Sequence, residues 1–201
     1  MVRVDRLEAS DADGLAWEAS AWVGNDWNRL WLRSEGEREH GATHAADLEL
    51  LYGRPVARWW DLLAGVRHDF QPGPSRTWAA VGIAGLAPQW FEVQATAYLG
   101  ESGALAAEAE VEYELLLTNR LVLQPLLELA WHGEDDPRRG IGSGLSSAEL
   151  GLRLRYEIDR QFAPYIGLVR ERVFGDTAEL RRAAGEDTGE TRVVAGVRFW
   201  F

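Results

Sequence analysis

Four glutamates at alternate positions, 108, 110, 112 and 114, form the most distinctive chemical pattern in this chain of 201 residues. They interleave with apolar residues from Leu105 to Leu115. Successive side chains of a strand point to opposite faces, so this spacing puts all four carboxylates on one face of a predicted strand. A row of carboxylates attracts cations, or forms ion pairs where arginines are within reach. The pattern predicts a surface that does one or the other.

Histidine beside carboxylate is the second candidate for metal chemistry. The chain has four histidines. When the hairpins are counted back from the carboxyl end, all four, including His40, fall towards the same end of the predicted structure. Imidazole with a nearby carboxylate suits divalent copper, and His68 with Asp69 supplies both groups just before a proline-rich loop. For each histidine taken singly, the alternative is a solvated surface side chain. The predicted copper ligands are His44, His68, Asp69 and His132.

No spacing of nucleophile, base and acid supports a catalytic site. Ser146, Ser147 and the histidines can be combined with carboxylates on paper, but without a recognisable arrangement. There is no glycine-rich phosphate loop and no zinc-type cluster. The net charge of −11 argues against a nucleic-acid partner, whose phosphates require a basic surface. We predict that the protein is not an enzyme, and keep a barrel-embedded lipase or acyltransferase as the catalytic alternative.

The elements that must position these residues are strands along the whole chain. The last run, residues 191–201, alternates apolar and polar positions and ends on Phe201, like the final strand of bacterial outer-membrane barrels. Eleven earlier runs alternate over about the length of a tilted membrane strand. Counted back from the carboxyl end, the tight turns fall at one end, and the two long loops, 133–146 and 175–190, fall at the other.

These runs predict an all-β fold: a single antiparallel up-and-down transmembrane β-barrel of twelve strands in the outer membrane. Ten or eight strands are the alternative counts, and a soluble barrel is the competing architecture. Tryptophans support the membrane assignment, because many of the ten stand at the ends of runs, where a girdle at the membrane interfaces would lie. The alternative is a set of core tryptophans. The girdle residues expected are Trp59, Trp60, Trp90, Trp131 and Trp200.

Charge decides which face of each strand turns inward. A soluble barrel would expose its acids, whereas a membrane barrel has a polar interior and an apolar outer face. Unpaired charges in a closed interior are costly, so Arg153 and Arg155 are the expected partners of the glutamate row. The functional interpretation is a narrow acidic path that favours cations, and the alternative is a salt-bridged plug. The predicted interior residues are Arg67, Glu108, Glu110, Glu112, Glu114, Glu149, Arg153 and Arg155.

Several motifs spread over nearly the whole chain carry a family resemblance. They are Gly65–Phe70, Gly73–Arg76, Leu86–Pro88, Trp90–Glu92, Tyr113–Thr118, Gly140–Leu145, Ala148–Tyr156 and Arg192–Phe201. Together they resemble the copper resistance protein B family (CopB/PcoB). The resemblance implies an outer-membrane β-barrel that is encoded with periplasmic copper-handling proteins and serves copper tolerance. Family members usually carry a methionine- and histidine-rich segment ahead of the barrel. With one methionine in this chain, we expect residues 1–201 to be the barrel domain without that segment or a signal peptide.

The expected function is that of an outer-membrane copper-tolerance protein that binds copper ions or conducts them passively through an acidic interior. The alternative is a plugged structural barrel that docks a periplasmic copper-binding protein. The partners expected are outer-membrane lipid, copper ions and such a periplasmic protein. Copper is the only cofactor expected, and folding is not expected to require it.

Overall fold

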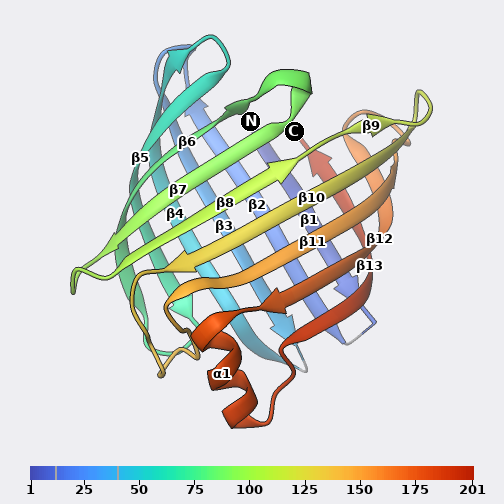
Figure 1. Ribbon diagram of the computed structural model, residues 1–201. Coiled ribbons are helices and arrows are strands. Elements are labelled where there is room, and N and C mark those ends of the chain that lie inside the picture. The colour runs from blue at the N-terminus through green and yellow to red at the C-terminus, as the bar shows by residue number, and fades with distance from the viewer. Residues whose placement is uncertain (12, 40) are drawn as a thin grey trace.

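The computed structural model describes residues 1–11, 13–39 and 41–201, which form one closed β-barrel (Figure 1). His40 therefore lies outside the described residues. Neighbouring strands pair antiparallel in chain order, and β1 pairs with β13 to close the barrel. The strands are β1 (Val2–Ser10), β2 (Gly14–Gly24), β3 (Arg29–Glu39), β4 (Ala42–Ala57), β5 (Trp60–Gln71), β6 (Arg76–Leu86), β7 (Glu92–Gly100), β8 (Leu105–Glu112), β9 (Leu115–Leu116), β10 (Leu121–His132), β11 (Gly144–Tyr156), β12 (Phe162–Val173) and β13 (Gly189–Trp200).

β8 and β9 are two parts of one barrel strand. Both pair with β10 in one continuous register, and the interruption lies opposite Pro125, which has no N–H to give to the ladder. Tyr113 still donates its N–H to the Pro125 carbonyl at 3.1 Å. With β8 and β9 taken together, the described chain forms a twelve-strand antiparallel barrel. The predicted fold class is therefore confirmed.

The two ends of the barrel differ in their connections. Both termini lie at one end, here called the terminal end, which is at the top of Figure 1. Short connections join the strands there, at residues 25–28, 58–59, 87–91 with the single turn η1 (Pro88–Trp90), 117–120 and 157–161. The opposite end, here called the loop end, carries the two longest connections, residues 133–143 and 174–188. Short connections, residues 72–75 and 101–104, also occur at the loop end, so it is the position of the two long loops that agrees with the prediction.

One of the long loops contains a short helix that the sequence analysis did not predict, α1 (Gly175–Ala184). Asp176 in its first turn and Arg181 and Arg182 in its last turn complement the helix dipole. Gly185 ends it in the left-handed conformation and donates its N–H to the last carbonyls. Ten residues within a polar loop are too few for a clear helical period, so the prediction of an irregular loop was wrong here. No helix among the described residues is long and apolar enough to cross a membrane.

The outer face of the strands is apolar, and the charged residues turn inward. Ile166 and Leu168 on β12 are 62% and 53% exposed on the outside, whereas Arg153 in the interior is only 2% exposed. A water-soluble barrel would bury the first set and expose the second. The reversal is the arrangement that surrounding lipid requires.

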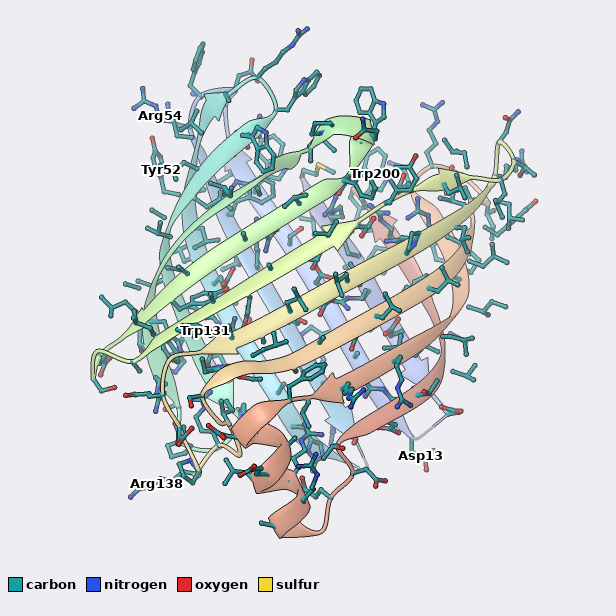
Figure 2. All side chains as sticks on the ribbon, viewed as in Figure 1. Asp13, Tyr52, Arg54, Trp131, Arg138 and Trp200 are labelled. Atoms are coloured by element: carbon teal, nitrogen blue, oxygen red, sulfur yellow. The ribbon has the colours of Figure 1, made fainter. Side chains whose placement is uncertain are left out.

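Tryptophans lie towards both ends of the barrel. Trp59 and Trp90 are exposed at the terminal end, with ring centroids 6.2 Å apart in an edge-on contact. Trp131 is exposed near the loop-end terminus of β10, and Figure 2 places it far from Trp200. Trp60 and Trp200 are half-buried, so part of each ring is also exposed. The positions agree with an aromatic girdle at two interfaces.

Closure between β1 and β13 depends on Gly196. A Cβ at this position would lie 2.6 Å from the Tyr165 hydroxyl and 2.7 Å from the Leu7 carbonyl oxygen. We expect Gly196→Val to destabilise the barrel by roughly 1–3 kcal/mol through overpacking. The measurement is the fraction of refolded protein that shows the gel-mobility difference between unheated and heated samples.

Ala195→Val is the matched control, because Ala195 is the exposed neighbour on the same strand. It should refold like the parent chain. Equal folding of both variants would contradict the assignment of Gly196 to the closing seam.

Candidate functional site

The centre of the barrel holds a cavity of about 290 Å³. The charged groups in its wall come from strands all around the barrel. Acids outnumber arginines in this wall, which gives it the composition of a cation-binding surface. The nine acids are Glu8, Glu35, Glu37, Asp47, Glu108, Glu110, Glu128, Glu149 and Glu171, and the three arginines are Arg6, Arg67 and Arg192.

Ion pairs cross the interior beside this cavity. Arg6 on β1 lies 2.7 Å from Glu128 on β10 and 2.7 Å from Glu18 on β2. Arg153 on β11 donates two hydrogen bonds, of 3.0 and 2.9 Å, to the carboxylate of Glu8 on β1. Since β1 is a sheet neighbour of neither β10 nor β11, these contacts join separate parts of the wall and narrow the interior.

Two further arginines form ion pairs on the loop-end side of the cavity, each with its own set of acids. Arg67 contacts three carboxylates, at 3.0 Å for Asp47, 2.7 Å for Asp69 and 2.7 Å for Glu108. Arg192 on β13 pairs with Glu37 on β3 and with other acids within 3.6 Å. Each of these arginines is shared among several acids.

A second group lies towards the terminal end. Arg198 on β13 is 3.2 Å from Asp5 and 2.9 Å from Glu114. Arg155 on β11 is 2.6 Å from the same Glu114 carboxylate. The central cavity therefore lies between two sets of ion pairs.

The glutamate row divides into paired and unpaired members. Glu108 is held by Arg67, and Glu114 by two arginines. Within the described residues, Glu110 and Glu112 form no salt bridge, and only Glu110 lines the central cavity. One oxygen of Glu112 is buried without a hydrogen-bond partner. Glu110 is therefore the member of the row whose carboxyl group faces the cavity with no arginine partner in the described part of the chain.

All eight predicted interior residues lie on the inner face of the barrel, as their contacts show. Arg155 pairs with the glutamate row, as expected. Arg153 does not, and pairs with Glu8 instead. In a closed barrel an inward side chain reaches across to the opposite wall, and the order of strands along the chain does not show which side chain it meets there.

The loop 133–143 is pinned into the mouth of the barrel at the loop end. Arg139 donates to Asp69 at 2.9 Å and to the Pro74 carbonyl at 3.3 Å, and its side chain is only 4% exposed. Asp136 of the same loop accepts a 2.6 Å hydrogen bond from Arg76. These two ion pairs fix the loop to β5 and β6, and the loop lines a cavity of about 30 Å³ together with His132.

The structure does not bring the predicted copper ligands together. His68 lies on the outer face, where its Nδ1 is 2.9 Å from Thr77 Oγ1 and its ring contacts Phe70. Asp69 points inward and is 5% exposed. Adjacent residues on a strand face opposite sides, so the predicted pairing of His68 with Asp69 was wrong.

The two remaining histidines have different environments. His44 is exposed near the start of β4. His132 lines the small loop-end cavity together with Asp69, and its Nδ1 is 2.7 Å from Ser146 Oγ. In the described part of the chain, no three histidine, cysteine or acidic side chains are grouped closely enough to hold a metal ion.

Several interior residues were missed by the sequence analysis. The inward-facing positions of the period-two alternation include Arg6, Glu8 and Glu128. The alternation therefore indicates them when it is followed through every run, including the weak first one. Arg139 is different. It stands in an irregular loop, where no periodicity indicates that its side chain enters the barrel.

A closed antiparallel barrel with an apolar outer face and a charged interior defines an outer-membrane β-barrel protein. Within that class, the chain belongs to the copper resistance protein B family, whose description "Copper resistance protein B precursor (CopB)" matches residues 1–201. It is 51% identical over 200 residues to a "Copper resistance protein B homolog" of Pseudomonas syringae pv. tomato, covering 98% of this chain and 68% of that protein. It is 47% identical over 204 residues to "Copper resistance protein B" of Escherichia coli, covering 100% of this chain and 69% of that one.

Solved porins share the fold. The NanC porin matches with a TM-score of 0.63 at 14% identity, over 100% of both chains. The KdgM porin, solved in complex with disordered oligogalacturonate, matches with a TM-score of 0.57 at 12% identity, over 100% of this chain and 99% of that one. Identities this low establish the barrel architecture alone.

The pair of Glu8 and Arg153 should contribute strongly to stability, because both side chains are almost fully buried. Glu8→Gln or Arg153→Met leaves an uncompensated partner, and we expect each to cost about 3–5 kcal/mol. The double variant should cost clearly less than the sum of the two single changes. Urea unfolding in lipid vesicles measures all three. Strictly additive losses would show that the two side chains do not act as a pair.

Proposed function

We propose that this outer-membrane barrel supports copper tolerance by binding copper ions in its acidic interior and letting them pass along it without an energy source. The observation that carries the proposal is the composition of the cavity wall, with nine acids against three arginines. Copper is the cargo in this proposal. The family to which the chain belongs supplies the link to copper, and the charge of the interior supplies the link to a cation.

The proposal includes an orientation of the barrel. Membrane barrels have short periplasmic turns and longer external loops. We therefore assign the terminal end to the periplasm and the loop end to the outside. In this orientation an ion from outside first meets Asp69 and His132 under the loop 133–143, and then reaches Glu110 in the central cavity.

A second candidate function is a plugged barrel that docks a periplasmic copper-binding protein. The observation that favours it is the set of ion pairs that cross the interior, above all Arg6 with Glu128 and Arg153 with Glu8. In that case the interior charges would serve stability, and copper would be handled by the partner.

Glu110 separates the two candidates, because its charge lines the cavity without holding an arginine. A unit charge about 4 Å from an ion contributes up to ~4 kcal/mol at the effective dielectric of a protein. We expect Glu110→Gln to weaken Cu²⁺ binding to the purified barrel at least about tenfold, with unchanged stability. Calorimetric titration with Cu²⁺ measures the first property, and urea unfolding measures the second.

Two variants complete this experiment. Glu101→Gln removes a carboxylate from an exposed turn and should change neither property. Glu108→Gln removes the partner of Arg67 and should reduce stability. If the Glu110 variant binds copper as the parent does, the interior is not the binding site and the plugged barrel is favoured.

Arg139 should control access from the loop end, since its guanidinium neutralises Asp69 in the mouth. We expect Arg139→Gln to release the loop 133–143 and to raise the ion conductance of single barrels in a planar bilayer severalfold. Arg138→Gln is the matched control, because Arg138 is the exposed neighbour that projects from the loop end in Figure 2. Equal conductance of the two variants would contradict a role for Arg139 in closing the mouth.

A further inference from the structure

β12 carries two arginines on its outer face near the loop end. Arg170 and Arg172 are exposed and follow Ile166 and Leu168 at alternate positions on the same face. Val169, between them and the apolar pair, points inward and is 1% exposed. The lipid-facing side of β12 therefore changes from apolar to cationic as the strand approaches the loop end, which is where lipid tails give way to headgroups.

Neither arginine has a carboxylate partner within the described residues. Arg170 Nη1 donates to Thr191 Oγ1 on β13 at 2.7 Å. The Arg172 guanidinium lies over the Phe174 ring, 5.5 Å from its centroid. Glu171 points to the opposite face, into the barrel interior, where it pairs with other arginines. Both outer guanidinium groups are thus oriented by neutral neighbours and keep N–H donors free for an anion.

The neighbours of Arg172 on the adjacent strands are small, whereas Arg170 lies opposite Leu150 on β11 and Thr191 on β13. Arg172 lies opposite Ala148 on β11 and Gly189 on β13. A Cβ at Gly189 would come within 3.4 Å of Arg170 Nη2, so the glycine leaves that guanidinium open on one side. A bulky headgroup can approach both arginines without meeting a large side chain from these two positions.

We propose that Arg170 and Arg172 form a binding site for the phosphate groups of lipopolysaccharide in the outer leaflet. Guanidinium groups bind phosphate oxygens through paired, charge-assisted hydrogen bonds. Basic residues beside an apolar surface are the arrangement that recognises anionic lipid headgroups. In a chain with a net charge of −11, general electrostatic attraction to anionic lipid is absent, so local contacts have to supply the affinity. The site rests on the orientation assigned under the proposed function and is independent of copper.

The test measures binding of labelled lipopolysaccharide to the purified barrel in an uncharged detergent. The arms are intact lipopolysaccharide, the same lipid with its phosphates removed, and inorganic phosphate as competitor. We expect Arg170→Gln and Arg172→Gln each to weaken binding of the intact lipid about tenfold, as loss of a charged hydrogen bond predicts. Arg170→Lys and Arg172→Lys keep the charge but lose the paired geometry, and should give intermediate values.

Arg160→Gln is the control for charge, because Arg160 is an exposed arginine at the terminal end without a carboxylate partner in the described chain; it should bind as the parent does. All variants are first checked for the heat-dependent gel shift of a folded barrel. Three results would overturn the proposal: parental binding by the double Arg→Gln variant, equal binding of the dephosphorylated lipid, or displacement of the lipid by an equal concentration of inorganic phosphate. Detergent exposes both ends and the assay contains no copper, so failure here is distinct from failure of the proposed copper function.

Discussion

In lipid, every backbone N–H and C=O has to find its partner within the protein, and the pairing of β1 with β13 gives the first and last strands of the sheet theirs. Closure removes the free sheet edges and fixes which face of each strand is inside. The alternation then sets most leucines, isoleucines and valines against lipid and the carboxylates in the interior, where a few apolar side chains such as Leu51 and Leu63 are also buried. The acidic character of the interior thus follows from closure.

Enclosing so many acids creates a second constraint, because charges removed from bulk water need partners. Arg153 holds Glu8, Arg6 holds Glu128, and Arg192 is shared among acids of several strands. Arginines are nevertheless too few to neutralise the cavity wall. The same ion pairs that stabilise the closed barrel also narrow it. In the proposed copper path, the same side chains have to serve both the stability of the barrel and the passage of ions, and acids without an arginine partner, such as Glu110, are the proposed binding positions for the cation.

The sequence predicted local features well and long-range contacts poorly. Period-two alternation was enough to predict twelve strands, and the charge on one face then predicted the inward direction of the row from Glu108 to Glu114. It also contained the reason why His68 and Asp69 cannot share an ion, although that consequence was not applied to them. The partner of Arg153 could not be predicted, because it depends on which side chain faces it across the closed barrel. Arg139, whose side chain lies in the mouth of the barrel, and helix α1 are both in loops, where no periodicity indicates their structure.

The most direct test of an acidic path for copper is Cu²⁺ entry into liposomes that contain the correctly inserted barrel, compared with entry of a neutral sugar and with protein-free liposomes. The account predicts that Cu²⁺ enters faster than the sugar when the barrel is present. No Cu²⁺ entry through inserted barrels, or entry no faster than that of the sugar, would contradict it. The interior charges would then serve the stability of the closed barrel alone.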